Sequence, residues 1–184
     1  MSYLDQLRQD HEDIQTVLAI MAEMSNRLGG ASPVNPVDLV KVVTYLEEFV
    51  LRGHLAKEER YLYPAIAQTG LPSDSGPLAV MVAEHTMAGN FLAGMRQAAA
   101  DWGQGDEDHR RVIGEYARNY ALLVAQHMEE EEQVVYPMAE QRLSPDAKRH
   151  LEEAFSQHEF QVMGPTGHDR YHEMAHELAE LYLN

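Results

Sequence analysis

Two segments of the sequence each place a histidine four residues before a glutamate and then close on a Tyr-Pro pair. They read HLAKEERYLYP, beginning at His54, and HMEEEEQVVYP, beginning at His127. On a helix, residues i and i+4 lie about 40° apart and one turn apart along the axis, so each histidine and its glutamate point the same way. Imidazole suits iron, and carboxylates bind and bridge metal ions. The two segments therefore predict a metal site.

Two further histidines extend this pattern into an internal repeat. The stretch QDHEDIQTVLAIM around His11 resembles AEHTMAGNFLAGM around His85, and each histidine is in line with the apolar stripe of its segment. His11 precedes His54 by 43 residues, and His85 precedes His127 by 42. The repeat predicts two similar helical hairpins that face each other and bring their polar residues into one layer of the core. Those residues are His11, His54, Glu58, His85, His127 and Glu131.

Burying four imidazoles and two carboxylates together is unfavourable unless cations compensate them. We therefore expect two non-haem iron ions, with Glu58 and Glu131 as bridging ligands. The histidines and the bridging glutamates fill about eight of the twelve positions of two six-coordinate ions, and an oxo or hydroxo bridge fills about two more. Dioxygen, nitric oxide or peroxide would bind at the positions left over.

The segments that carry these residues have helical periodicity. Apolar residues recur at helical spacing, no strand-like alternation continues for long, and Ala, Leu, Met, Glu and Gln dominate. We expect four long helices near residues 3–28, 36–69, 77–101 and 106–141, and two shorter ones near 145–161 and 167–183. A capping residue precedes a proline at Asn35-Pro36 and Ser144-Pro145. Five methionines at helical spacing are expected to fill the core: Met21, Met24, Met81, Met87 and Met95.

Short connections between long helices indicate an all-α fold, an antiparallel up-down four-helix bundle with two additional C-terminal helices. Pro64 and Pro137 are expected to kink the second and fourth helices or to end their regular hydrogen bonding. We expect residues 1–141 to form the metal-binding bundle and residues 142–184 to form a helical extension packed on it.

Composition excludes several classes of function. A formal net charge of −16 over 184 residues argues against nucleic-acid binding and against docking on an anionic membrane. No apolar run approaches the roughly 20 residues that span a bilayer, and MSYLDQLRQDH lacks the apolar core of a signal peptide. These features predict a cytoplasmic protein. The absence of cysteine excludes thiol catalysis, disulfides and cysteine-bound iron–sulfur clusters.

As an ordered set, these motifs resemble the hemerythrin-like family, the His-His-Glu cation-binding domains. The resemblance covers about residues 5–141 and is carried by His11, HLAKE at 54–58, EH at 84–85 and HMEEE at 127–131. It implies an antiparallel four-helix bundle around a non-haem di-iron centre. It also implies that the four histidines are iron ligands and that Glu58 and Glu131 bridge the ions.

The sequence departs from the oxygen-carrying hemerythrins in two places. Those proteins have an additional histidine one turn from the third, whereas Met81 and Gly89 occupy that spacing around His85. They also place the second bridging acid five residues after its histidine, at the position of Glu132, but that spacing rotates the side chain about 140° away, so we prefer Glu131. The set is closer to relatives linked with iron–sulfur centre repair, nitric oxide and iron sensing, although the repair proteins generally carry an additional N-terminal segment with cysteine.

Other residues near these motifs have two interpretations. Glu84 either orients an imidazole or is a solvated acid. One of Tyr61, Tyr63 and Tyr136 either reaches an iron or hydrogen-bonds a bound ligand, or, as we favour, all three pack at the core or rim. In the last helix, His168, His172, His176 and Glu180 share a face. That face is predicted to be half-buried or a homodimer contact, and the alternatives are a fifth imidazole, a second metal site or a response to pH.

The leading hypothesis is a di-iron protein that binds or reacts with a small diatomic ligand or peroxide in sensing, storage or stress detoxification. A second hypothesis is an iron-storage or iron-sensing module whose metal content controls folding or partner binding. An enzyme that decomposes peroxide or reduces nitric oxide is less favoured. A bundle with incidental histidines is the remaining alternative.

Overall fold

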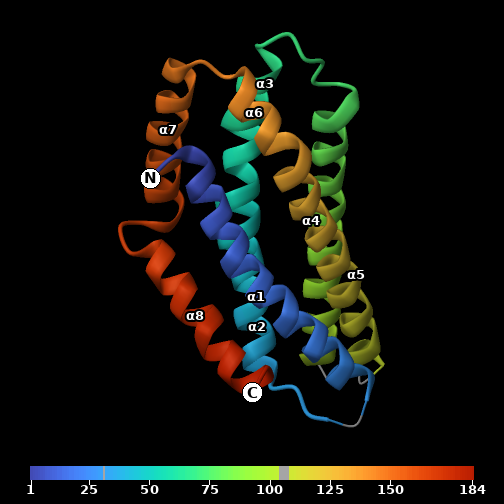
Figure 1. Cartoon of the computed structure of the whole chain (residues 1–184). Helices are drawn as coiled ribbons and strands as arrows, with labels where there is room; N and C mark the ends of the chain where they lie inside the picture. Colours follow the sequence, from blue (N-terminus) through green and yellow to red (C-terminus); the bar gives the residue numbers. More distant parts are fainter. Residues whose placement is uncertain (31, 104–107) are drawn as a thin grey trace.

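The computed structural model describes residues 1–30, 32–103 and 108–184, and every regular element in those ranges is helical. The expected antiparallel bundle with two further C-terminal helices is confirmed (Figure 1). The first helix is α1 (Tyr3–Gly29) and the third is α4 (Gly76–Gly103). The second helix runs without a break through α2 (Pro36–Tyr45), η1 (Leu46–Leu55), η2 (Glu58–Leu62) and α3 (Tyr63–Ala67).

The fourth helix and the extension complete the chain. The fourth helix comprises α5 (His109–Glu130), η3 (Glu131–Val135) and α6 (Tyr136–Arg142). Its expected start at residue 106 lies outside the described residues. The extension consists of α7 (Pro145–Met163) and α8 (Gly167–Tyr182).

The helix starts follow the capping signals in the sequence. The Asn35 side chain accepts a hydrogen bond from the Val37 N–H at 3.0 Å, and Ser144 accepts one from the Ala147 N–H at 3.2 Å. Ser2 and Asp5 form a reciprocal capping box at the start of α1. Each cap satisfies backbone donors that lack a partner within the helix.

The second and fourth helices contain wide π-helical turns directly before their prolines. The Tyr63 N–H donates to the Glu58 carbonyl and the Tyr136 N–H donates to the Glu131 carbonyl, so each bond spans five residues instead of four. Proline removes a backbone donor and its ring clashes with the preceding turn, so an irregularity was expected there. The structure places it before Pro64 and Pro137, where the turns begin at the two predicted bridging glutamates. π-helical turns inside α-helices are frequent at functional sites.

The extension packs on one hairpin of the bundle. Helices α7 and α8 contact α1 and the second helix, and Figure 1 shows them on the side of the bundle away from α4 and α5. At the contact, Phe155 is fully buried, and the His158 ring nitrogen lies 2.8 Å from the Arg52 carbonyl. The extension therefore covers the half of the bundle that contains His11 and His54.

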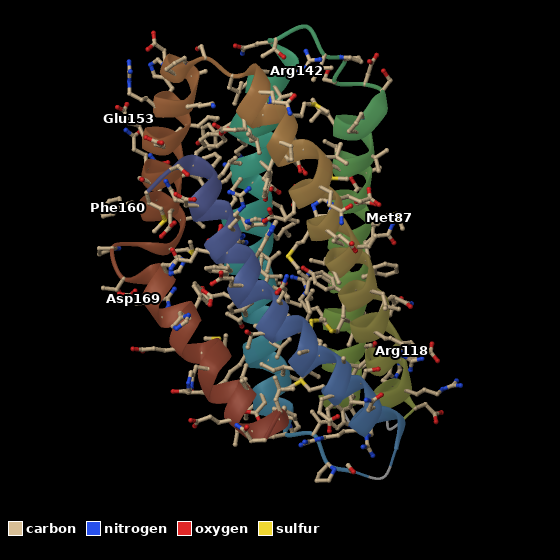
Figure 2. The ribbon with its side chains drawn as sticks, viewed as in Figure 1. Met87, Arg118, Arg142, Glu153, Phe160 and Asp169 are labelled. Carbon is tan, nitrogen blue, oxygen red and sulfur yellow. The ribbon has the colours of Figure 1, made fainter. Side chains whose placement is uncertain are left out.

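The methionine prediction is correct at four positions and wrong at one. Met21, Met24, Met81 and Met95 are buried. Met87, however, is 47 % exposed and points outward from α4 (Figure 2). Helical spacing alone does not distinguish a residue on the buried face of a helix from one beside that face, such as Met87.

Candidate metal centre

The structure brings the six predicted residues together in the middle of the bundle. They form two groups of four, His11 and His54 with the two glutamates and His85 and His127 with the same two glutamates. Within each group the candidate ligand atoms all lie within 4.8 Å of one another, and every residue is buried. Glu58 and Glu131 belong to both groups. This is the arrangement that two adjacent cations sharing two carboxylates require.

Each imidazole is oriented by a carboxylate from a neighbouring helix. His54 Nδ1 lies 3.0 Å from Asp10 Oδ2, and His127 Nδ1 lies 2.8 Å from Glu84 Oε2. A carboxylate accepts hydrogen bonds, so Nδ1 carries the proton and donates it. Glu84 therefore lies within hydrogen-bond distance of an imidazole, and its orienting role stays a prediction.

The other two histidines follow the same rule across the two hairpins. His85 Nδ1 lies 2.7 Å from Glu59 Oε1, and His11 Nδ1 lies 3.3 Å from Glu132 Oε1. Glu132 is thus outside the group, on the outer side of an imidazole, whereas Glu131 is inside it. The four orienting acids obey the repeat, with Asp10 matched to Glu84 and Glu59 matched to Glu132.

The remaining ring nitrogens point at one another, which fits a cation between them. His11 Nε2 lies 3.2 Å from His54 Nε2, and His85 Nε2 lies 3.0 Å from His127 Nε2. With Nδ1 protonated, a neutral imidazole presents a lone pair at Nε2, and two facing lone pairs repel. Glu131 Oε2 is also buried and makes no hydrogen bond among the described residues, because His11 Nε2 at 3.3 Å and His127 Nε2 at 3.5 Å carry no proton in this tautomer. A buried acceptor without a donor is costly, and a bound metal ion removes that cost.

Two tyrosine hydroxyls hold the shared carboxylates. Tyr63 Oη donates to Glu131 Oε1 at 2.7 Å, and Tyr136 Oη donates to Glu58 Oε1 at 3.0 Å. Burial and the adjacent carboxylates raise the pKa of both phenols well above the usual value, so both remain protonated donors. The burial of both rings confirms the predicted core packing, and their hydroxyls also reach the shared carboxylates.

Charge complementarity inside the centre is strong even without metal. Burial opposes the charged form of Glu58, but His54 and His85 outweigh it and hold the Glu58 pKa below its usual range. Burial likewise opposes a charge on His11 and His85, but Glu131 beside His11 and Glu58 beside His85 raise the pKa of these imidazoles. A cation entering the centre therefore competes with protons for the same nitrogen atoms.

A buried lysine, which the sequence did not single out, lies beside this layer. Lys57 is 1 % exposed, and its Nζ is 2.5 Å from Asp10 Oδ2. It also lies 3.8 Å from Glu159 Oε2 on α7. Although Asp10 is buried, Lys57 and the histidines around it hold its pKa below the usual range. The sequence contains one signal for this residue. At the matching position of the other hairpin stands Glu130, so the repeat changes the sign of the charge there.

Three of the predicted additional residues lie away from the centre. The Tyr61 ring packs against Phe155 and His158 of α7. His172 is mostly exposed and bonds Asp13 through Nδ1 at 2.7 Å. His176 is 70 % exposed and lies 3.8 Å from Glu180. The structure therefore does not bring a fifth imidazole from the last helix, and His176 with Glu180 is a surface pair.

Solvent reaches the edge of the centre at one imidazole. A cavity of about 390 Å³ opens between α1 and the fourth helix. It is lined by His11, Gln15, Ala125, Met128, Glu129, Glu132 and Gln133. The acidic lining favours the approach of cations.

Across the described ranges, no helix has the length and apolar character needed to cross a membrane.

Comparison with known proteins identifies related sequences. The family model of the hemerythrin HHE cation binding domain matches residues 2–139. The iron-sulfur cluster repair protein YtfE of Yersinia pseudotuberculosis is 39 % identical over 89 residues, which cover 47 % of this chain and 39 % of that protein. YtfE proteins of Escherichia coli and Shigella boydii are each 37 % identical over 83 residues, which cover 45 % of this chain and 37 % of theirs.

The matched stretch thus spans about two fifths of the length of these curated relatives. No solved structure matches the chain significantly.

Proposed function

From the premise that the chain belongs to the hemerythrin family of HHE cation-binding domains, we propose that it is a non-haem di-iron protein. It binds or reacts with dioxygen, nitric oxide or peroxide in sensing, storage or stress detoxification. The observation that carries this proposal is the pair of four-residue groups that share Glu58 and Glu131.

In the proposed centre, His11 and His54 would hold one iron, His85 and His127 would hold the other, and Glu58 and Glu131 would serve both ions. Two iron ions held this way supply electron exchange and a place for a small ligand. An oxo or hydroxo bridge between them belongs to the same proposal.

The chain's own residues have separate tasks. The orienting acids Asp10, Glu59, Glu84 and Glu132 fix each imidazole with Nε2 turned inward. The phenols of Tyr63 and Tyr136 hold the carboxylates, and their raised pKa keeps their protons in place. Burial of all six proposed ligands excludes bulk water from between them.

The proposed division of the chain assigns the centre to residues 1–141 and leaves residues 142–184 as an extension. It is supported by the family match, which ends at residue 139. It is also supported by the packing of α7 and α8 on the outside of α1 and the second helix. All six proposed ligands come from one chain, so the centre is complete without a second copy. The homodimer contact expected on the last helix stays a prediction.

A second candidate function is participation in iron–sulfur cluster repair, in which iron of this centre is the cargo. It is favoured by the YtfE relatives, whose printed name describes that role. An iron-storage or iron-sensing role uses the same centre, with metal content coupled to the packing of α7 and α8. A peroxide-decomposing or nitric-oxide-reducing enzyme is the catalytic alternative.

The test is anaerobic loading with ferrous iron, followed by metal analysis and optical spectra before and after addition of dioxygen, nitric oxide or peroxide. About two irons per chain are expected, and a value well below two would refute the di-iron proposal. A stable reversible oxygen spectrum favours carriage, rapid oxidation favours sensing, and sustained consumption of peroxide or nitric oxide favours an enzyme. Transfer of the iron to a cluster-deficient acceptor protein favours repair.

Matched variants locate the ions. His54→Ala and Glu58→Ala should lose metal, because each removes a proposed ligand and Glu58 serves both ions. His176→Ala is the control for the histidine, since His176 also precedes a glutamate by four residues but is exposed. Glu153→Ala, on the outer face of α7 (Figure 2), is the control for the carboxylate. Retention of both ions by the first pair would refute the ligand assignment.

A further inference from the structure

The centre has two halves, one with His11 and His54 and the other with His85 and His127. They match in their proposed ligands but differ in the charged partners of the acids that orient the histidines. Behind His54, Asp10 is paired with the buried ammonium of Lys57. Behind His11, Glu132 is paired with Arg8, whose Nε lies 3.0 Å from Glu132 Oε2. In this half, both acids that orient an imidazole therefore have a cationic partner.

In the other half, no lysine or arginine among the described residues pairs with the orienting acids. Glu59 and Glu84 each accept a hydrogen bond from Nδ1 of the histidine they orient, and no other charged partner is found for them within the described ranges. The repeat makes the difference visible in the sequence. Lys57 is matched to Glu130, and Arg8 is matched to Val82.

The C-terminal extension keeps Lys57 out of water. Its Nζ lies 5.9 Å from the centre of the Phe155 ring and 3.8 Å from Glu159 Oε2, both on α7. His168 of α8 lies 3.6 Å from the other oxygen of Asp10. Glu159 is partly exposed, so solvent screens its charge more than that of the buried ammonium. The positive charge of Lys57 therefore acts mainly on the Asp10–His54 pair.

We propose that the two metal positions are unequal, with the His85–His127 position binding a divalent cation more tightly than the His11–His54 position. This rests on the proposed two-ion centre. A carboxylate whose charge is not offset by a cationic side chain raises the basicity of the imidazole it orients and attracts the metal ion. A carboxylate paired with an ammonium or guanidinium has a weaker effect on both. Lys57 and Arg8 are the positioning residues that cause the inequality, and the extension maintains it by burying Lys57.

The test is a stepwise titration of the metal-free full chain with Zn(II), followed by the ¹⁵N resonances of the histidine side chains. With one equivalent of Zn(II), the Nε2 resonances of His85 and His127 should shift, and those of His11 and His54 should shift with the second equivalent. Mutation of a residue that hydrogen-bonds to a metal ligand typically alters metal affinity by about 10- to 100-fold. We therefore expect the affinities of the two positions to differ by at least roughly tenfold. Parallel shifts of both pairs, or the reverse order, would overturn the proposal.

Two variants test the cause. Lys57→Met keeps an unbranched side chain, one heavy atom shorter, and removes its charge, so binding at the His11–His54 position should tighten and the two steps should converge. Arg8→Gln makes the same charge change at an exposed site, so it tests the idea even if Lys57→Met does not fold, and a smaller tightening is expected. Arg96→Gln is the control, because Arg96 forms a surface pair with Glu47.

The outcomes separate this inference from the proposed centre. Saturation at two Zn(II) per chain without an order of binding refutes the inequality alone. Saturation at one ion refutes the two-ion centre and the inequality with it. Unchanged steps in both the Lys57→Met and Arg8→Gln proteins, relative to Arg96→Gln, refute the assigned cause.

Discussion

Replacing Tyr136 with phenylalanine removes one hydroxyl from the centre and leaves the ring in place. That hydroxyl donates to Glu58 at 3.0 Å and lies 3.1 Å from His11 Nε2. The Glu58 pKa is lowered, so the acceptor is a buried carboxylate at neutral pH. Hydrogen bonds to charged groups contribute about 1.5–3 kcal/mol to stability. We therefore expect the metal-free Tyr136→Phe protein to lose about that amount of unfolding free energy.

The assay is urea unfolding of chelator-treated protein at pH 7, followed by far-ultraviolet circular dichroism. In a thermal scan, the expected loss corresponds to a fall in Tm of roughly 3–12 °C for a chain of this size. Tyr63→Phe should behave in the same way, because Tyr63 donates to Glu131 at 2.7 Å. Both variants should still bind two ions, since the phenols hold carboxylates and are not proposed as ligands.

Tyr45→Phe is the matched control. Tyr45 is fully buried, but its hydroxyl has no hydrogen-bond partner among the described residues. Removing a polar group that is buried without a partner should be neutral or stabilising. If Tyr136→Phe cost no more than Tyr45→Phe, the hydroxyl would not be holding the carboxylate. Loss of an ion from Tyr136→Phe would instead make the phenol a ligand.

Three further predictions concern protons and local backbone. The raised pKa values of His11 and His85 stabilise the metal-free fold at low pH. That contribution is complete below the unfolded value of about 6.5 and is lost as pH rises through the higher folded values. Zn(II) binding should correspondingly release protons and weaken as pH falls, which calorimetry in buffers of different ionisation enthalpy measures; affinity independent of pH would contradict this. Gly164→Ala should lose about 1 kcal/mol in urea unfolding, because Gly164 has φ +78° between α7 and α8; an unchanged midpoint would contradict the strain. Ser144→Ala should lose about 1 kcal/mol through its N-cap, whereas Ser144→Thr should retain most of the stability.

The helices and the grouping of the six residues were predictable because local signals specify them. Asn35 and Ser144 fix helix starts through bonds to nearby backbone. The separation of four residues between His54 and Glu58 fixes the relative direction of their side chains on any helix. The repeat then placed the two hairpins face to face, since a hairpin with polar residues on its inner side needs a partner of the same kind.

The features that were missed depend on contacts between distant segments. Lys57 is buried because α7 packs on the second helix, and nothing next to Lys57 in the sequence indicates that contact. Tyr63 points at Glu131 because a π-helical turn shifts its phase by one residue relative to a regular helix. His176 and Glu180 carry the same spacing as the central pairs yet lie on the surface, because no second hairpin faces them.

The polar layer also has a consequence for how the chain selects one packing among many. Apolar side chains such as leucine and methionine tolerate lengthwise shifts of one helix against another, since one apolar contact can replace another. A shift by one turn, about 5.4 Å, would separate Asp10 from His54 and Glu84 from His127 and leave buried charges without partners. Slipped arrangements are therefore penalised far more than a purely apolar bundle would penalise them, and the centre fixes the lengthwise alignment of all four helices before any ion binds.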